Sequence, residues 1–173
     1  MPSICSFESE SSAPLQFRRI ISGAEENSPV ASSGRFGDHF LTVETTSMPH
    51  NDYGRLYSRL LDFSVGRHSC LRMAIFVRGD SSGRLSISTL NQDHPISERR
   101  ILFAGSLQDQ QKMSWHRLAF SLGLRNVPFR VVVEVNKVSS RDRFWLGIDD
   151  VSVESGVCDG DSSRDPMVIG NFT

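Results

Sequence analysis

The sequence predicts an all-β protein built from two antiparallel sheets that stack as a sandwich. Short segments along most of the chain alternate apolar and polar residues with the period of two that half-buried strands require. Clusters of Gly, Asn, Asp, Ser and Pro separate these segments at intervals of roughly ten to fifteen residues. Helical periodicity is poor between them, which favours antiparallel pairing over units that alternate strands with helices.

Each predicted strand is bounded by turn residues or by a change of pattern. In chain order the predicted strands are 39–45, 70–79, 83–90, 99–105, 115–122, 129–135 and 144–153. The alternation is clearest in 83–90, where one face holds Leu85, Ile87 and Thr89 and the other holds Arg84, Ser86 and Ser88. A strand with this pattern buries one face in a core and presents the other to water.

Two segments depart from the strand pattern. Segment 54–63 places Leu56, Leu60 and Phe63 at the i, i+4 and i+7 positions of one helical face, which predicts a short helix. Segment 22–37 is polar, rich in Gly and Ser and without periodicity, which is typical of a long surface loop.

The acidic pair Asp149–Asp150 interrupts the last predicted strand. Before the pair the apolar face holds Leu146 and Ile148, whereas after it the apolar face is set by Val151. A change of phase by one residue is what a β-bulge produces. We therefore expect a bulge that turns one of the two carboxylates towards something other than bulk water.

Length and charge exclude several classes of function. The 173 residues are one domain's worth of chain, and the formal net charge is −1. A near-neutral balance gives no electrostatic footprint for nucleic acid or for an anionic membrane surface. No apolar run is long enough to insert into a bilayer. The start of the chain lacks the basic and apolar regions of a signal peptide, as expected of a cytoplasmic protein or of a piece of a longer precursor.

The sequence offers no constellation of residues for catalysis, so we expect a protein that is not an enzyme. The histidines show no metal-ligand spacing; they are His39, His50, His68, His94 and His116. No nucleophile-elbow, phosphate-loop or dinucleotide-binding motif occurs in the sequence. Three cysteines, Cys5, Cys70 and Cys158, leave the redox compartment open, because a cytosolic protein can carry three free thiols and a secreted one would pair them.

Carboxylates near both ends of the chain are candidate cation ligands. They are Glu8, Glu10, Asp38, Asp149 and Asp150. Calcium takes six or more oxygens, which two or three carboxylates and loop carbonyls would supply. The alternative is that these side chains are solvated or form hydrogen bonds in turns.

Aromatic residues are candidates either for the core or for ligand stacking. Trp115 lies within a predicted strand and is assigned to the core. Trp145 shares a strand face with Asp149, so its role stays open. Exposed coplanar aromatic residues on a sheet would indicate a carbohydrate-binding module, and the candidates for such a platform are Phe76, Phe103 and Trp145.

The order of these segments resembles the MAM domain, the extracellular module shared by meprins, neuropilins and receptor tyrosine phosphatases. The matching segments are "CSFES", "DHFLTVET", "GRLYSRLLDFS", "HSCLRMAIFVRG", "GRLSI", "WHRLAFSL", "FRVVVEV" and "FWLGIDDVSVESGVC". The likeness covers residues 5–158, interpreted as the domain, with 1–4 as a stub and 159–173 as a tail or linker. Met73 stands where the family usually has Phe.

The resemblance implies an antiparallel two-sheet jelly-roll sandwich, in which we expect the first and last strands to be neighbours. It also implies a disulfide between Cys70 and Cys158, worth at most roughly 4–5 kcal/mol in the chain-entropy model. The family's usual partner for Cys5 is missing, so Cys5 is either free or paired outside the module. The family's cation site implies Glu8, Asp38 and Asp149 as ligands of a structural Ca²⁺ or Na⁺.

The resemblance further implies an extracellular, non-catalytic interaction or adhesion module of a secreted or membrane-anchored protein. Its partner would be another protein, through oligomerisation or contact between identical copies. The alternative function is a carbohydrate-binding module on the same architecture, with a glycan as the partner. If Cys70 and Cys158 were reduced and far apart, a cytosolic sandwich would be favoured instead.

Overall fold

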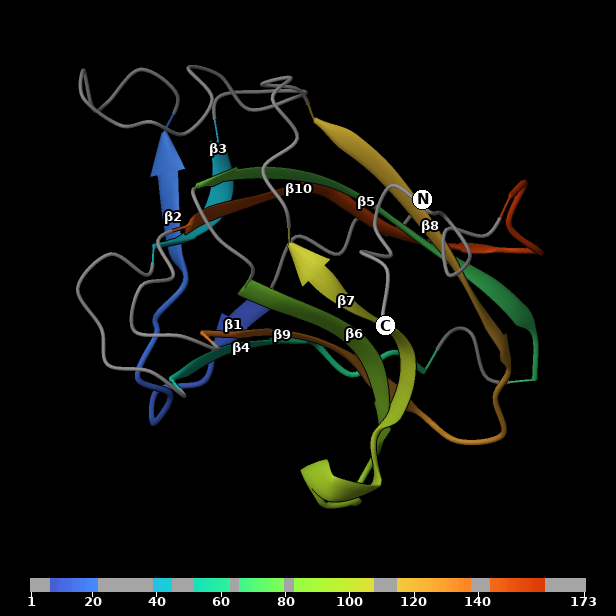
Figure 1. The fold of residues 1–173 in the computed structure, drawn as a ribbon. Helices are drawn as coiled ribbons and strands as arrows, with labels where there is room; N and C mark the ends of the chain where they lie inside the picture. The colour runs from blue at the N-terminus through green and yellow to red at the C-terminus, as the bar shows by residue number, and fades with distance from the viewer. Residues whose placement is uncertain are drawn as a thin grey trace, which may run out of the picture.

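The computed structural model describes most of the 173-residue chain. The described residues are 7–21, 39–44, 52–62, 66–79, 83–107, 115–137 and 144–160. They form ten strands and one short 3₁₀ helix, arranged as two stacked sheets (Figure 1). Within these ranges no helix combines the length and apolar character needed to cross a membrane.

Each sheet holds five strands, and every neighbouring pair is antiparallel. The strands of sheet 1, in spatial order, are β1 (Phe7–Ser9), β4 (Tyr53–Ser58), β9 (Phe129–Asn136), β6 (Gly83–Asn91) and β7 (Arg100–Leu107). Those of sheet 2 are β2 (Arg18–Ile21), β3 (His39–Glu44), β10 (Phe144–Ser155), β5 (His68–Gly79) and β8 (His116–Leu124). The helix η1 (Ile96–Glu98) lies in the β6–β7 connection.

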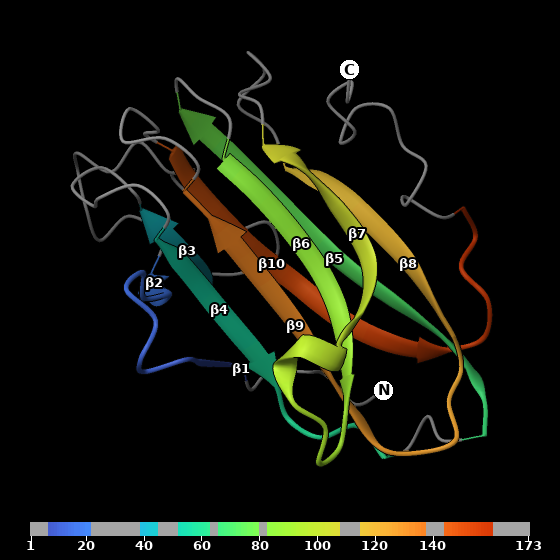
Figure 2. The ribbon, with the colours of Figure 1, turned by 60° about the horizontal axis from the view of Figure 1, so that its bottom comes forward.

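The order of the strands is that of a jelly roll. Consecutive strands lie side by side in one sheet only for β2–β3 and β6–β7, and every other connection crosses to the opposite sheet. Figure 2 shows the strands of the two layers running in nearly the same direction, as in aligned sandwich packing. The predicted class, an all-β antiparallel two-sheet jelly-roll sandwich, is confirmed.

Apolar residues at every second position of the central strands fill the space between the sheets. In β9 these residues are Phe129, Val131, Val133 and Val135, all fully buried in one cluster. Sheet 2 contributes to the same cluster the residues Leu71, Met73, Ile75, Leu118, Phe120, Leu122, Phe144, Leu146 and Ile148. Side chains alternate between the two faces of a strand, so the intervening residues face outward.

Segment 54–63 is not the predicted helix. Its first part belongs to strand β4, which pairs with β1 on one side and with β9 on the other. Leu56 is buried, whereas Arg55 and Tyr57 are only partly buried, so burial in this segment follows the period of two of a strand. Pairing on both sides stabilises the segment more than a single short helix could, because short isolated helices are marginal in water.

The first and last strands are not neighbours, contrary to the expectation from the sequence. Strand β1 pairs with β4 at the edge of sheet 1, whereas β10 lies between β3 and β5 in sheet 2. The pattern did not predict β1 and β2, which have only three and four residues. The chain changes sheets between these two strands, so it is β2 that shares a sheet with β10.

The predicted β-bulge in the last strand is confirmed. Asp149 lies opposite Ala74 and Ser152 opposite Arg72, so β10 carries one extra residue between these pairs. Asp150 adopts a positive φ of 55°, which Asp tolerates better than most residues. Its backbone N–H donates a hydrogen bond of 2.8 Å to Asp149 Oδ1. Asp149 is half-buried and Asp150 is exposed.

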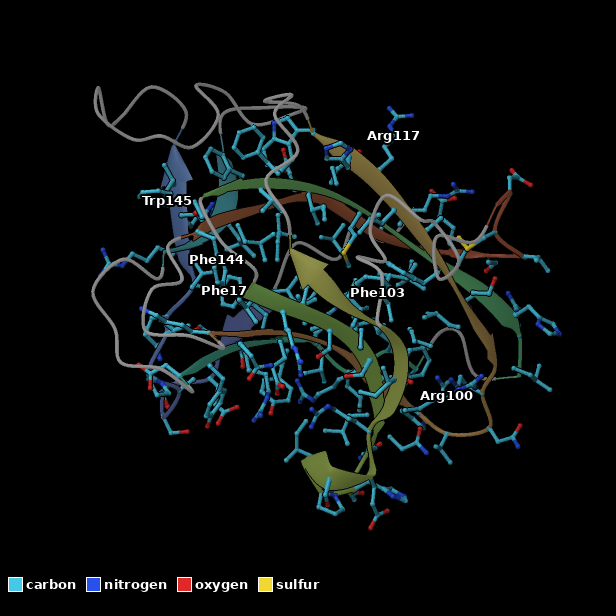
Figure 3. The ribbon with its side chains drawn as sticks, in the orientation of Figure 1. Phe17, Arg100, Phe103, Arg117, Phe144 and Trp145 are labelled. Carbon is cyan, nitrogen blue, oxygen red and sulfur yellow. A yellow bond between two sulfur atoms is a disulfide. The ribbon has the colours of Figure 1, made fainter. Side chains whose placement is uncertain are left out.

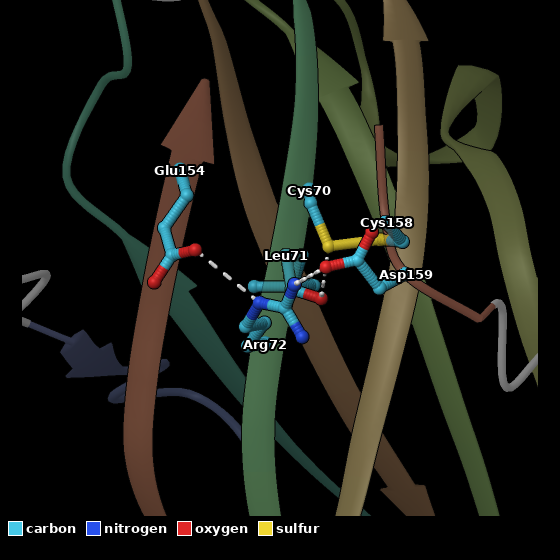
Figure 4. Close-up of a disulfide and its surroundings, with 6 residues drawn as sticks. All are labelled: Cys70, Leu71, Arg72, Glu154, Cys158 and Asp159. Carbon is cyan, nitrogen blue, oxygen red and sulfur yellow. Dashed lines mark hydrogen bonds and ion pairs between the residues drawn. A yellow bond between two sulfur atoms is a disulfide. The ribbon is translucent and has the colours of Figure 1, made fainter. Parts of the chain in front are cut away.

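Cys70 and Cys158 form a disulfide, as the resemblance implied (Figure 4). Their Cα atoms are 5.1 Å apart and their separation along the sequence is 88 residues. The bond fastens the segment after β10 to strand β5. Beside it, Arg72 forms ion pairs with Glu154 (3.3 Å) and Asp159 (3.9 Å), shown as dashed lines in Figure 4.

Replacing both bonded cysteines, as Cys70→Ser with Cys158→Ser, should lower the free energy of unfolding by about 2–4 kcal/mol. The reason is that the bond closes a long loop and restricts the unfolded chain. Denaturant unfolding without reductant measures the change. The control is Cys5→Ser, which replaces a cysteine and leaves this bond intact; Cys5 lies outside the described residues. Equal unfolding midpoints for the double variant and the control would contradict the prediction.

Candidate functional site

The outer face of sheet 1 gathers charged and hydroxyl-bearing side chains from several strands. We call this set the polar face; its members are Glu10, Tyr53, Arg55, Tyr57, Ser86, Arg99, Glu134 and Asn136. The register aligns Arg55, Glu134 and Ser86 in one row across β4, β9 and β6. Because the alternate residues of β9 fill the core, Glu134 points away from it.

Glu134 is the centre of the polar face. Only 7% of this residue is exposed, although it lies on the outer side of the sheet. Its carboxylate accepts hydrogen bonds from Arg55 Nε (2.7 Å), Asn136 Nδ2 (3.0 Å) and Arg99 Nη2 (3.3 Å). The charge of Arg55 also lies close, with Nη2 at 2.6 Å. These side chains cover Glu134 and neutralise it.

Arg55 joins Glu134 to a second carboxylate, that of Glu10. The distance from Arg55 Nη1 to Glu10 Oε2 is 2.7 Å. The hydroxyls of Tyr53 and Tyr57 each donate to Glu10 at 3.2 Å. The guanidinium of Arg55 also lies over the ring of Tyr53, 4.6 Å from its centroid. One arginine therefore fixes two carboxylates and two tyrosines in a single arrangement.

The network keeps both carboxylates charged at neutral pH. Burial alone would raise the pKa of Glu134, but hydrogen bonds from Asn136 and Arg55 outweigh it and hold this pKa below its ordinary value. The same balance holds for Glu10. Burial raises its pKa, but the hydrogen bond from Ser12 and the charge of Arg55 outweigh burial, so the pKa lies below its ordinary value. Burial lowers the pKa of Arg55, yet its bonds to Glu134 more than reverse this.

Two polar atoms on the polar face are buried without a hydrogen-bond partner. They are Ser86 Oγ and Arg99 Nε. Arg99 precedes β7 and reaches Glu134 on β9, so its side chain crosses β6, which lies between these strands. Ser86 lies on β6 directly opposite Glu134. Unpartnered buried polar atoms are uncommon in folded proteins, and a pair of them on one face indicates capacity for further hydrogen bonds.

The aromatic candidates lie elsewhere and pack in apolar clusters. Trp115 packs outside the space between the sheets, against Phe40 and Phe76 on sheet 2, with ring centroids 5.7 and 5.8 Å apart. Trp145 joins this second apolar cluster and is partly buried. Trp115 therefore packs in an apolar cluster, as predicted, but this cluster lies on the outer side of sheet 2 and not between the sheets. Phe103 is buried between the sheets.

The residues predicted to bind a cation are not brought together in the described parts of the chain. Glu8 is exposed on β1 of sheet 1, whereas Asp149 lies on β10 of sheet 2. Asp38 lies outside the described residues. Among the described residues no group of three or more His, Cys, Asp or Glu side chains is placed to hold a metal. The Ca²⁺ or Na⁺ site stays a prediction.

Comparison with protein families gives one match across nearly the whole chain. The model described as "MAM domain, meprin/A5/mu" matches residues 2–159. This chain belongs to the MAM family. The match confirms the resemblance in the sequence and, like the disulfide, supports an extracellular module. A comparison with curated proteins finds no sequence match.

Solved structures share the fold of this MAM domain at low identity. The K3 adhesin domain of Lys-gingipain from Porphyromonas gingivalis has 15% identity and a TM-score of 0.57, covering 81% of this chain and 91% of that one. The xylan-binding domain from CBM 22 has 15% identity and a TM-score of 0.51, covering 90% and 88%. The Clostridium thermocellum xylanase 10B modules, complexed with xylohexaose, have 11% identity and a TM-score of 0.56, covering 89% of this chain and 26% of that one. At these identities the likeness shows the fold alone.

Neither sequence pattern nor composition indicated the polar face. Glu134 and Arg55 are 79 residues apart, and no local spacing links them. The only signal was a glutamate in the otherwise apolar run of β9, which a buried partner explains. Glu10 was considered as a cation ligand, whereas the structure pairs it with Arg55.

Arg55→Met should destabilise the MAM domain by about 3 kcal/mol, because it leaves a buried carboxylate without its main partner. Thermal or denaturant unfolding measures the change. The matched control is Arg72→Met, whose ion pairs with Glu154 and Asp159 lie at the surface and contribute less than about 1 kcal/mol. Equal losses in the two variants would show that the polar face is not held by its charges.

Acid should weaken the domain through Glu134 and Glu10. Their pKa values are lowered on folding, so the stability they contribute is present above the ordinary pKa of 4.5 and is lost as the pH falls through the folded values. The measurement is the melting temperature of wild type and Glu134→Gln between neutral pH and pH 3. The gap between the two should narrow below about pH 4.5. A constant gap would refute the linkage.

Proposed function

We propose that this MAM domain is a non-catalytic interaction module of a larger extracellular protein and that it binds another protein. The observation that carries the proposal is the family match over residues 2–159, which includes both sheets and the disulfide. A disulfide-closed sandwich holds its surface side chains in fixed positions, and such preorganisation lowers the entropy lost on binding. The adhesin domains of Lys-gingipain, which share the fold, are compatible with this function.

Self-association, in which identical copies of the domain bind each other, is the kind of protein binding to test first. Beads coated with the domain should cluster, and sedimentation should show a mean mass that rises with protein concentration. The control is an unrelated β-sandwich protein of similar size on the same beads. Dispersed beads together with a monomer at sub-millimolar concentration would remove self-association as the mechanism.

A second candidate function is glycan binding, which one observation favours. Ser86 Oγ and Arg99 Nε are buried without partners on the polar face, and sugar hydroxyls would satisfy both once the side chains that cover them move aside. Domains of the same fold include one described as xylan-binding and one solved with β-1,4-galactotriose. Against it, Phe76 and Phe103 are buried, so neither offers a flat stacking surface.

The two functions differ in how strongly binding depends on the hydroxyl of Ser86. For a glycan site, Ser86→Ala should weaken binding to a neutral oligosaccharide several-fold. The matched control is Ser88→Ala, because Ser88 lies on the same strand and its hydroxyl already donates to Val132 O at 3.4 Å. A glycan array without hits would remove the glycan candidate and leave protein binding as proposed.

A further inference from the structure

A buried arginine at one end of the sandwich has no carboxylate partner among the residues that the structure describes. Arg125 lies where the chain leaves β8 for β9, and only 9% of it is exposed. Its Nε donates to Leu122 O at 3.1 Å, and its Nη2 donates to the hydroxyl of Thr89. The guanidinium lies 5.2 Å from the centroid of the Phe129 ring. All of these partners are uncharged.

A buried charge without an opposite charge beside it is energetically unfavourable. Buried charges in proteins are normally paired or ligated, because removing them from water is costly. Among the described residues no Asp or Glu side chain forms an ion pair with Arg125; the pairs there involve Arg55, Arg72, His94 and Arg99. The positive charge of Arg125 is therefore not neutralised by the described parts of the domain.

A second arginine approaches the first. Arg100 begins β7 and lies opposite Thr89, the residue that Arg125 contacts. Its Nη1 is 3.7 Å from the position that a Cβ on Gly123 would take, which places it beside the end of β8 (Figure 3). Arg100 is exposed and forms no ion pair with any described residue. Burial and the charge of Arg100 both lower the pKa of Arg125.

The surroundings of this end include another exposed arginine and an apolar rim. Arg67 and His68 are exposed just before and at the start of β5, where His68 lies opposite Leu124. Leu124 and Val127, on either side of Arg125 in the chain, are 56% and 42% exposed. Glu98, an acid of the β6–β7 connection, is bonded to His94 at 2.7 Å instead of to either arginine.

We propose that Arg100 and Arg125 form a binding site for a tetrahedral oxyanion, of the kind present in a sulfated sugar or in free sulfate or phosphate. Guanidinium groups suit such an anion, because their N–H groups form parallel charge-assisted hydrogen bonds. Arg100 makes the exposed contact, and Arg125 supplies fixed positive charge from below. Where the anion is part of a sugar, Leu124 and Val127 contact the sugar. The site does not depend on the protein-binding function proposed above.

The simpler explanation is that Arg125 is purely structural. Its bonds to Leu122 O and Thr89 tie the β8–β9 connection to β6, and this would hold without any ligand. That explanation does not account for Arg100, which makes no such bonds and adds repulsion. Arg100 is therefore the residue that separates the two explanations, and its exposure makes a substitution compatible with folding.

The test measures binding of four probes to the wild-type domain and to two variants at constant ionic strength. The probes are sodium sulfate, sodium phosphate, a sulfated oligosaccharide and the same oligosaccharide without sulfate. Arg100→Gln should weaken binding of the oxyanion probes about tenfold, the loss expected for one charge-assisted hydrogen bond. The control Arg84→Gln removes another exposed charge, on β6 opposite Asn136 and away from Thr89, and should leave binding of the probes unchanged.

The probes also identify the source of the anion. If the sulfated oligosaccharide binds more tightly than free sulfate, the site is assigned to a sulfated sugar. If the two bind equally tightly, the site is assigned to a free oxyanion. Equal effects of Arg100→Gln and Arg84→Gln, no binding of any oxyanion probe, or equal binding of the unsulfated sugar would overturn the proposal. Bead clustering of Arg100→Gln at the wild-type level would show that protein binding is a separate property.

Discussion

The burial of alternate residues between the two sheets is the constraint on which the other features depend. In β9 it places four apolar side chains inward, and in β10 it does the same for Phe144, Leu146 and Ile148. A strand has a period of two, so the side chain of Glu134 must then project from the outer side of sheet 1, and that of Trp145 from the outer side of sheet 2. A slip of one residue in either strand would bury a carboxylate in the core. The core thus fixes the register, and the register fixes both outer faces.

Charge is distributed unevenly over a protein whose net charge is only −1. On the polar face, Glu10 and Glu134 are matched by Arg55 and Arg99, so the face is neutral and tightly hydrogen-bonded. A buried network of this kind adds little net stability over apolar packing, but it fixes one arrangement of side chains. Because its charges are already paired, covering this face with a neutral polar partner requires less desolvation than covering free charges.

The sequence predicted what depends on local pattern. Seven of the ten described strands and the bulge at Asp149 follow from the period of two and its single change of phase. The disulfide came from the family resemblance, because spacing alone cannot pair three cysteines. Segment 54–63 was misassigned because Leu56 fits both periods, and only pairing with β1 and β9 decides between them. The polar face was not predictable, since its members come from segments far apart in the chain that only the fold brings together.

The contrast between the polar face and the end near Arg125 bears on what each surface can bind. Glu134 shows how this fold treats a buried charge when no ligand is required: it surrounds the charge with opposite charge and hydrogen bonds. Arg125 is buried to a similar degree, yet its partners are a carbonyl, a hydroxyl and an aromatic ring, and the positive charge of Arg100 lies close enough to lower its pKa. The same sequence can pair arginines with glutamates, as Arg55 demonstrates. Among the described residues no acid pairs with Arg125 or Arg100, and the oxyanion proposed above would supply the missing negative charge.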